Sequence, residues 1–273
     1  MALEQKYIQA ILETATVAAR LAGQKAAEEI NFIKVSVKNN VELVTQADGK
    51  CQKIIIDHVK ESFPDHGFIA EEGENGKMFK LHPRGNEPIW WIIDPIDGTN
   101  NFAHKLPLYV VSIAVMYQNE PIVAVVFDPS TDSMFTAVKG GPALLNNRKI
   151  EIFDESMDKF ASIGMDSHFE NKIPQWVQNV ILKTRFRNLG TTALHLALVG
   201  SGAFIASIAA EPKLWDIAAG ALIAQSAGAI ITNFKGQEIF PIDIDAYNSD
   251  KIEILAANKK VHQKLVDLIN SNT

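Results

Sequence analysis

Apolar residues recur with regular spacing along most of the 273-residue chain. In residues 3–29 they return every three or four positions on one face, which predicts an amphipathic helix. The same spacing predicts a second helix over residues 47–62, and the following Phe63-Pro64-Asp65 segment ends it. The chain therefore opens with two helices that each present one apolar face.

Short apolar runs predict the strands of the first half. These runs lie at residues 41–45, 68–70, 89–93, 109–117, 121–127 and 134–138. Gln118-Asn119-Glu120 separates two of them and predicts a hairpin turn. Residues 73–88 contain glycines, a proline and charged residues, and they are predicted to form a loop.

The second half alternates between strand and helix patterns. Strands are expected at 161–165, 204–208, 229–232 and 252–256, and helices at 172–184, 192–199, 216–227 and 260–269. Gly140-Gly141-Pro142 interrupts the pattern between the halves. We therefore expect one structural unit of the α/β (α+β) class, with an α+β lobe over 1–142 and an α/β lobe over 143–273 that completes the site.

Composition and charge narrow the class of protein. With 47% apolar and 21% charged residues the chain is typical of a globular protein rather than a disordered one. The net charge of −6 disfavours nucleic acid as the main partner. A single cysteine, Cys51, excludes an internal disulfide and fits the cytoplasm. Charges throughout residues 3–29 argue against a signal peptide, and no run of about 18 apolar residues predicts a membrane helix.

Two aspartates follow one of the apolar predicted strands. In the segment Trp91-Ile-Ile-Asp94-Pro-Ile-Asp97-Gly-Thr99, a buried strand runs directly into Asp94 and Asp97. Pro95 fixes its own φ and Gly98 permits a tight turn, so both carboxylates should enter one cleft. Two such carboxylates repel each other unless a divalent cation lies between them. Hard oxygen ligands without histidine favour magnesium over zinc.

The alternative for this segment is an ordinary turn. Asp-Pro and Asp-Gly are common turn dipeptides, and an isolated Asp-x-x-Asp-Gly is more often structural than metal-binding. The preceding apolar strand and the following Thr99 reverse that preference. Gly98 and Thr99 should also open a short helix through Phe102, where backbone N–H groups suit an anionic phosphate.

Four segments together resemble one known family. The run Trp91-Ile-Ile-Asp-Pro-Ile-Asp-Gly-Thr-Asn-Asn-Phe102 is similar to the first signature of the inositol monophosphatase family, which comprises lithium-sensitive, magnesium-dependent phosphatases. Trp215-Asp216-Ile-Ala-Ala-Gly220 with Ala227-Gly228-Ala229 resembles its second signature. Leu43-Val-Thr-Gln-Ala-Asp48 and Phe68-Ile-Ala-Glu-Glu72 match upstream elements. The resemblance spans about residues 3–270 and implies a layered αβαβα sandwich, a homodimer and lithium inhibition.

The resemblance also implies a set of metal ligands. Glu71, Asp94 and the backbone carbonyl of Ile96 would hold one Mg²⁺ ion. Asp94 would bridge to a second ion that Asp97 and Asp216 also bind, and two or three ions would take part. Asp216 precedes an apolar helical run, so it could alternatively serve as a helix cap.

Catalytic and phosphate-binding roles follow from the same resemblance. Glu71 and Thr99, with Asp48 behind Thr99, would position and deprotonate the attacking water. The backbone N–H groups of Gly98 and Thr99 would hold the phosphate group. Such a site needs no covalent intermediate, because bound metal ions activate water and neutralise the phosphate charge.

A third segment is a candidate for substrate contact. The run Arg187-Asn-Leu-Gly190-Thr191-Thr192-Ala193 resembles the family's substrate-hydroxyl loop, with Gly190, Thr191 and Thr192 as its candidate residues. An ordinary N-capped helix is the alternative interpretation.

One departure from the family bears on the substrate. Members that prefer inositol phosphate carry an acidic residue shortly before the Trp-Asp pair, where this chain reads Ser207-Ile-Ala-Ala210. Glu211 is nearby but is expected to point elsewhere. The first hypothesis is hydrolysis of a small phosphorylated metabolite similar to inositol 1-phosphate. The second is the same chemistry on fructose 1,6-bisphosphate, 3′-phosphoadenosine 5′-phosphate or histidinol phosphate.

A third hypothesis is not enzymatic. Some bacterial relatives act as RNA-polymerase or RNA-associated factors, and such a scaffold would be free to lose its metal ligands. All six acidic and hydroxyl side chains expected at the site are present, which favours an enzyme: Asp48, Glu71, Asp94, Asp97, Thr99 and Asp216.

Overall fold

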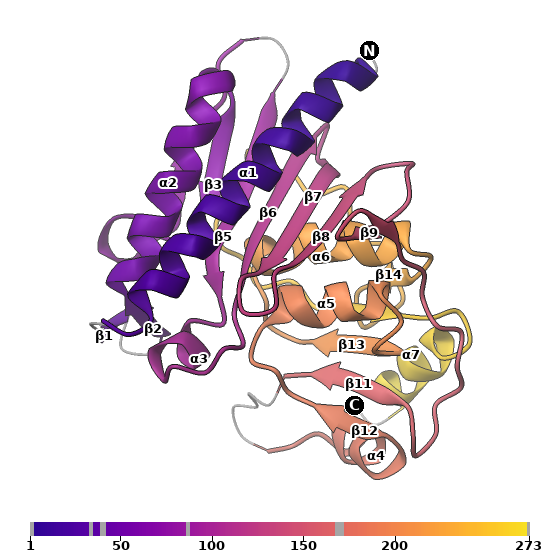
Figure 1. Ribbon diagram of the computed structural model, residues 1–273. Coiled ribbons are helices and arrows are strands. Elements are labelled where there is room, and N and C mark those ends of the chain that lie inside the picture. Colours follow the sequence, from indigo (N-terminus) through magenta and orange to yellow (C-terminus); the bar gives the residue numbers. More distant parts are fainter. Residues whose placement is uncertain (1–2, 33–34, 39–41, 86–87, 167–171, 272–273) are drawn as a thin grey trace.

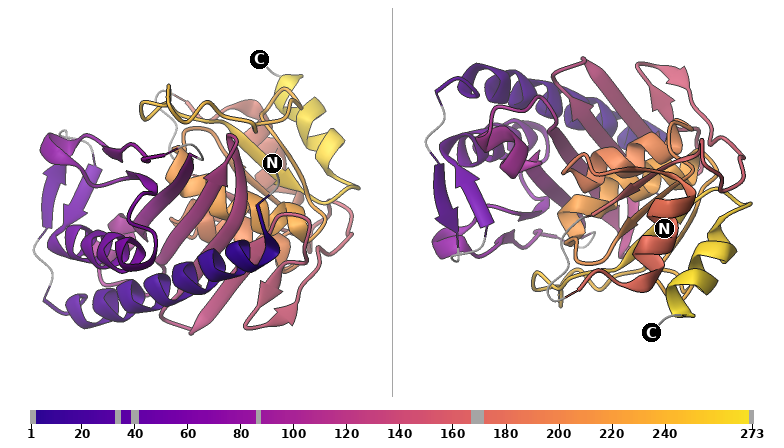
Figure 2. Two further views of the ribbon diagram at one scale, coloured as in Figure 1. Left: turned by 90° about the horizontal axis from the view of Figure 1, so that it is seen from above. Right: turned by 90° about the horizontal axis from the view of Figure 1, so that it is seen from below.

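The computed structural model describes residues 3–32, 35–38, 42–85, 88–166 and 172–271. Two sheets and three layers of helices alternate in the order αβαβα (Figure 1). Figure 2 shows the N-terminal helices and the C-terminal half of the chain on opposite sides of the first sheet. The layered sandwich predicted from the sequence is therefore confirmed.

The first two layers come from the first half of the chain. Helices α1 (Gln5–Glu29) and α2 (Gln46–Ser62) cover one face of an eight-stranded sheet with strand order β10-β9-β8-β7-β6-β5-β3-β4. Its strands are β3 (Gly67–Ala70), β4 (Phe79–Leu81), β5 (Ile89–Asp97), β6 (Val110–Tyr117), β7 (Glu120–Asp128), β8 (Ser133–Val138), β9 (Leu144–Leu145) and β10 (Arg148–Lys149). A separate hairpin pairs β1 (Val35–Lys38) with β2 (Glu42–Thr45).

The remaining three layers come from the second half. Helices α5 (Thr192–Gly200) and α6 (Leu214–Ser226) lie between the two sheets. The second sheet has the order β12-β11-β13-β15-β14. Its strands are β11 (Ser162–Met165), β12 (Arg185–Arg187), β13 (Ala206–Ala209), β14 (Ile230–Thr232) and β15 (Ile254–Ala257). Helices α4 (Gln175–Lys183) and α7 (His262–Asn270) form the outer layer, and the short α3 (Thr99–Ala103) follows β5.

Four clusters of buried apolar side chains fill the four spaces between these layers. Strand β5 lies in a sheet that is covered on both faces, which explains why its sequence is a continuous apolar run. Trp91 and Ile93 pack toward α1 and α2, whereas Trp90 and Ile92 pack toward α6. All nine residues of β5 are buried. The strand that carries Asp94 and Asp97 is thus held rigidly from both sides.

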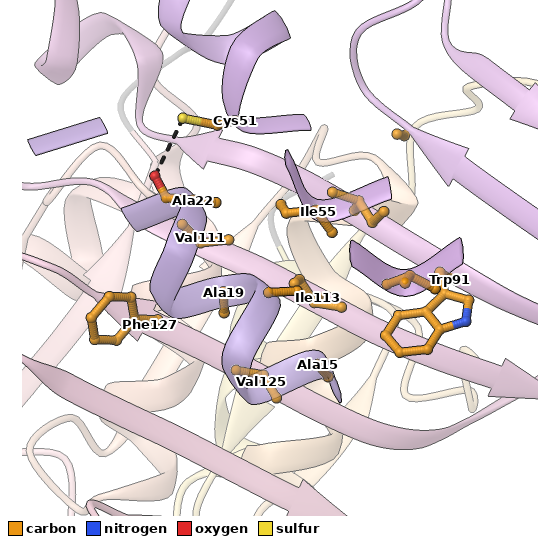
Figure 3. Close-up of a cluster of buried hydrophobic side chains, with 14 of the residues drawn as sticks. Ala15, Ala19, Ala22, Cys51, Ile55, Trp91, Val111, Ile113, Val125 and Phe127 are labelled. Atoms are coloured by element: carbon orange, nitrogen blue, oxygen red, sulfur yellow. Dashed lines mark hydrogen bonds between the residues drawn. The ribbon is translucent and has the colours of Figure 1, made fainter. Parts of the chain in front are cut away.

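The first cluster brings α1 close to the sheet through small side chains (Figure 3). Ala15, Ala19 and Ala22 face the strands, and the Cys51 thiol of α2 donates a hydrogen bond to the carbonyl of Ala22 at 3.3 Å. Burial raises the pKa of that thiol to about 12. Cys51 is therefore a packing residue.

The predicted loop at 73–88 is wrong in part, because it contains β4. This strand is an edge of the first sheet and pairs with β3, and Lys80 anchors it to a distant segment. The Lys80 ammonium group donates to the carbonyl groups of Ile244, Asp245 and Tyr247 at 2.8–3.0 Å. Neither contact can be read from local sequence.

Other boundaries differ by a few residues. Helix α6 begins at Leu214, before the predicted start at 216, and β13 lies slightly after the predicted 204–208 run. The first sheet continues through β9 and β10, beyond the boundary expected after residue 142. In the described ranges, no helix combines the length and apolarity needed to cross a membrane.

Candidate active site

Two carboxylates meet at the end of β5 because the strand is irregular there. Asp94 and Asp97 are three positions apart, so in a regular strand their side chains would point to opposite faces. The pairing with β6 shifts between these residues, as in a β-bulge. The Oδ1 atom of Asp94 also accepts a hydrogen bond from the N–H of Ile96 at 3.0 Å, which holds the turn. Both carboxylates consequently face one side.

Asp216 completes a group of three. Carboxylate oxygen atoms of Asp94, Asp97 and Asp216 lie within 4.8 Å of one another. Asp216 is in the first turn of α6, and its Oδ2 atom accepts a hydrogen bond from the N–H of Lys213 at 2.6 Å. The helix-cap interpretation of Asp216 and its place in the acidic group are therefore compatible. Ser112 of β6 donates to the carbonyl of Trp215 at 3.1 Å and ties the start of this helix to the first sheet.

Burial and repulsion between carboxylates raise the pKa values of Asp94 and Asp97. The pKa of Asp94 is well above its usual range because the side chain is desolvated and faces Glu71, Asp97 and Asp216. Burial and the charge of Asp216 raise the pKa of Asp97 to about 8. A divalent cation among these oxygens would offset the repulsion and favour the ionised forms. The all-oxygen donor set fits Mg²⁺.

Asp48 and Thr99 form a second polar unit beside the group. The Thr99 hydroxyl lies 3.1 Å from Oδ1 of Asp48 and 3.0 Å from the carbonyl oxygen of Ile96. The other carboxylate oxygen of Asp48 accepts hydrogen bonds from the N–H and the hydroxyl of Thr45, at 2.8 and 2.6 Å. Asp48 thus caps α2 and faces Thr99 at once. Burial raises its pKa, although these hydrogen bonds oppose the effect.

Glu71 lies at the edge of the acidic group. It directly follows β3, and its N–H donates to the carbonyl of Ile93 at 3.2 Å. Its charge is the second largest cause of the raised pKa of Asp94, so it faces that residue. The group of three aspartates within 4.8 Å does not include Glu71.

The predicted substrate loop reaches the same site. The Thr191 hydroxyl donates to Oδ2 of Asp97 at 2.5 Å, and the N–H of Ala193 donates to the same oxygen at 2.7 Å. The N–H of Thr192 also faces Asp97 and lowers its pKa. Thr191 caps α5 as well, since its Oγ1 accepts from the N–H of Leu194 at 3.3 Å. Contact of Gly190, Thr191 or Thr192 with a substrate stays a prediction.

A side-chain amide that the sequence analysis did not single out connects the two loops. Asn101 Nδ2 donates to the carbonyl groups of Leu108 at 2.7 Å and Leu189 at 2.6 Å. Gly98 and Gly190 have φ values of 100° and 70°, in the left-handed region. A Cβ atom on Gly190 would lie 2.7 Å from Asn101 Nδ2. The one sequence signal for Asn101 is its position within the 91–102 segment.

Asp166 is a further acidic residue that the sequence analysis missed. It directly follows β11, a strand end comparable to that of Asp94 and Asp97. Burial, followed by the charge of Asp216, raises its pKa to about 6. Glu211, in contrast, pairs with Lys251 at 2.5 Å and is exposed, in line with the expectation that it points elsewhere.

Comparison with known proteins connects this geometry to a family. A sequence model of the inositol monophosphatase family matches residues 7–273. The chain is 32% identical over 264 residues to "Nus factor SuhB" of Xylella fastidiosa, covering 93% of this chain and 92% of the relative. It is 34% identical over 214 residues to "Inositol-1-monophosphatase" of Rhizobium meliloti, covering 76% and 78% of the two chains.

A solved structure shares the same architecture. The crystal structure of an "IMPase/NADP phosphatase complexed with NADP and Ca2+" superposes with a TM-score of 0.82 at 26% identity, and covers 97% of both chains. The five-layered fold, the strand-end aspartates and the match over nearly the whole sequence lead to one conclusion. This chain belongs to the inositol monophosphatase family.

Proposed function

We propose that this protein is a magnesium-dependent phosphatase that hydrolyses the phosphate monoester of a small polyol, with inositol 1-phosphate as the first candidate. The observation that carries the proposal is the group of three carboxylates within 4.8 Å, formed by Asp94, Asp97 and Asp216. Burial and repulsion from neighbouring carboxylates oppose ionisation of Asp94 and Asp97, and a bound cation would offset both effects.

The metal ligands would come from five residues. Asp94, Asp97 and Asp216 would hold the ions together with Glu71 and the backbone carbonyl of Ile96. Bound Mg²⁺ would lower the pKa of water, neutralise phosphate charge and stabilise the leaving alkoxide.

The hydroxyl of Thr99 would orient the attacking water. Its hydrogen is directed to Asp48 or to the Ile96 carbonyl, so the lone pairs of its oxygen are left to accept a hydrogen bond from that water. Asp48 holds this arrangement because its other oxygen is fixed by Thr45. Glu71 would take the proton, and the N–H groups of Gly98 and Thr99 would bind the phosphate oxygens.

The proposal is tested by phosphate release from inositol 1-phosphate, with and without Mg²⁺. We expect release that depends on Mg²⁺ and that falls by about 10³-fold or more in Asp97→Asn. Asp245→Asn is the matched control, because Asp245 is an exposed carboxylate on a different segment. If wild-type protein with Mg²⁺ released no phosphate from any monoester, the phosphatase proposal would be wrong.

Other monoesters stay as alternatives within the same chemistry. Fructose 1,6-bisphosphate, 3′-phosphoadenosine 5′-phosphate and histidinol phosphate belong in the substrate panel. NADP joins them, because the solved relative is described as an NADP phosphatase in complex with NADP. The substrate with the highest kcat/KM identifies the natural class.

A second candidate function is that of a Nus factor, which the similarity to "Nus factor SuhB" favours. It would be tested by capture of bacterial RNA polymerase on immobilised protein. Capture that is equally strong with Asp97→Asn would support a partner role separate from the metal site. The homodimer and the cytoplasmic location also stay predictions, and light scattering of the purified protein would test the first.

A further inference from the structure

A buried histidine of the middle layer contacts the predicted substrate loop at 187–193. His195 lies in α5 and is fully buried. Its Nε2 atom accepts a hydrogen bond from the backbone N–H of Leu189 at 2.9 Å. Burial lowers the pKa of His195 to about 4, so the ring is neutral at pH 7. Because Nε2 accepts a hydrogen bond, the one proton of the neutral ring must be on Nδ1.

The imidazole ring has a fixed place between α5 and the second sheet. Helix α5 runs beside β13 and β11 of that sheet (Figure 1). A Cβ atom on Gly164 of β11 would lie 3.0 Å from Cγ of His195 and 2.9 Å from the ring of Phe204. Gly164 pairs with Ser207 of β13, so the Ser207 side chain faces the same interlayer space. A larger residue at 164 would therefore displace the ring.

Packing alone does not account for a histidine at this position. Nδ1 of His195 and Oγ of Ser207 are buried, and neither atom has a hydrogen-bond partner among the described residues. A buried polar atom without a partner lowers the stability of the fold. An apolar side chain of similar size at 195 would avoid this cost. The contact of Nε2 with Leu189 is the feature that distinguishes the imidazole from such a side chain.

Both polar groups of the Leu189 backbone are held by side chains. His195 accepts from its N–H, and Asn101 Nδ2 donates to its carbonyl oxygen at 2.6 Å. Thr191 lies two positions later, and its hydroxyl donates to Oδ2 of Asp97 at 2.5 Å. A displacement of Leu189 would therefore also move the hydroxyl that orients Asp97.

We propose that His195 is a positioning residue, whose neutral ring with its proton on Nδ1 holds Leu189 so that Thr191 presents its hydroxyl to Asp97. This inference rests on the proposed function, because the orientation of Asp97 matters to activity only if Asp97 binds Mg²⁺. His195 acts through the loop. The role explains why a histidine occupies a buried position where one of its nitrogen atoms stays unpaired.

The test measures the Mg²⁺ concentration that gives half-maximal thermal stabilisation, which requires no turnover. His195→Leu loses the acceptor, and we expect this concentration to rise about 3–10-fold. His195→Gln can place its amide oxygen near the position of Nε2 and should stay within about twofold of wild type. His262→Leu is the matched control, because His262 is a buried histidine that contacts Thr232 at 2.9 Å instead of the loop. The control should leave the Mg²⁺ affinity unchanged.

Equal Mg²⁺ affinity in His195→Leu and wild type would overturn the proposal. Equal losses in the leucine and glutamine variants would overturn it too, because they would assign His195 to packing alone. If the leucine variant does not fold, ¹⁵N NMR of wild type labelled at histidine decides. We expect the His195 signals, identified by their absence in His195→Gln, to show the proton on Nδ1. A proton on Nε2 would exclude the bond from Leu189 and overturn the proposal.

Failure of the phosphatase proposal would look different. A wild-type protein that Mg²⁺ stabilises, but that releases no phosphate, contradicts the phosphatase alone, and the variants still decide the role of His195. A wild-type protein that Mg²⁺ does not stabilise contradicts both proposals.

Discussion

The hydroxyl group of Thr191 lies 2.5 Å from Oδ2 of Asp97, although the two residues are 94 positions apart in the sequence. Asp97 ends a strand of the first sheet, whereas Thr191 caps a helix of the middle layer. The N–H of Ala193 reaches the same oxygen at 2.7 Å. The orientation of one candidate metal ligand is therefore set by the other half of the chain.

Removing this hydroxyl should weaken cation binding. We expect Thr191→Val to reduce Mg²⁺ affinity about 10-fold, because groups that orient a ligand matter nearly as much as the ligand. The free energy of unfolding should also fall by about 1–2 kcal/mol, since α5 loses its cap. The measurement is the Mg²⁺ concentration that gives half-maximal thermal stabilisation. Thr191→Ser keeps the hydroxyl and should behave as wild type. Equal Mg²⁺ affinity in the valine and serine variants would contradict the role of the hydroxyl in orienting Asp97.

Gly98 is expected to tolerate no Cβ atom. Its φ is 100°, and a Cβ would lie 2.9 Å from the carbonyl oxygen of Leu108. Gly85 has a φ of 97° with nothing within 4 Å of a Cβ, so it is a matched control. Both alanine variants incur the left-handed cost of about 1–2 kcal/mol. Gly98→Ala should lose additional stability, measured by urea unfolding, and should also lose activity, whereas Gly85→Ala should show neither loss. Equal losses in the two variants would contradict the close approach of Leu108 to Gly98.

Thr99→Val should separate catalysis from binding. The variant keeps the shape of the side chain and loses the hydroxyl that faces Asp48. We expect kcat to fall by about 10²–10³-fold with little change in KM, as for loss of a group that acts in proton transfer. Thr99→Ser should retain most of the rate. A valine variant that raised KM alone would instead indicate a role in substrate binding.

His66 should make stability depend on pH. Trp91 Nε1 donates to its Nδ1 and the Tyr7 hydroxyl contacts its Nε2, both at 2.8 Å, so the neutral ring fits this position. Burial lowers the pKa of His66 to about 4. The unfolded chain takes up the proton near pH 6.5 and the folded chain does not, so this contribution is complete above pH 6.5 and is lost as pH falls toward 4.

The expected difference can be isolated with His66→Asn, whose side-chain oxygen replaces Nδ1 as acceptor. Between pH 7 and pH 5 the stability of wild type relative to this variant should fall by about 2 kcal/mol. Urea unfolding at both pH values gives the four free energies, and other titrating groups cancel in the difference. Parallel pH profiles would show that His66 is protonated equally in the folded and unfolded chains.

The sequence predicted most elements because their signals are local. Helical spacing in α1 and the unbroken apolar run of β5 are visible within single segments. Strand β4 was not predicted, since it depends on pairing with β3 and on Lys80 reaching carbonyl groups more than 160 positions away. The short strand β12 likewise forms through its parallel pairing with β11.

Part of the candidate site could likewise be predicted from local sequence, and part could not. Asp94, Asp97 and Asp216 could be named from motifs, and the structure brings their oxygen atoms together. The bulge that turns Asp94 and Asp97 to one side arises in the pairing of β5 with β6 and has no local pattern. The contacts of Asn101 with Leu189, 88 positions away, exist in the folded chain alone.

The alternation of side chains along β5 has a spectroscopic consequence. The four tryptophans of the chain are spread over three of the four apolar clusters. Trp91 lies in the first cluster, its neighbour Trp90 lies in the second with Trp215, and Trp176 lies in the third. Phenylalanine replacements that leave one indole at a time would therefore turn intrinsic fluorescence into a separate reporter for three of the four interlayer spaces. Adjacent positions in the sequence, Trp90 and Trp91, would record opposite faces of one sheet.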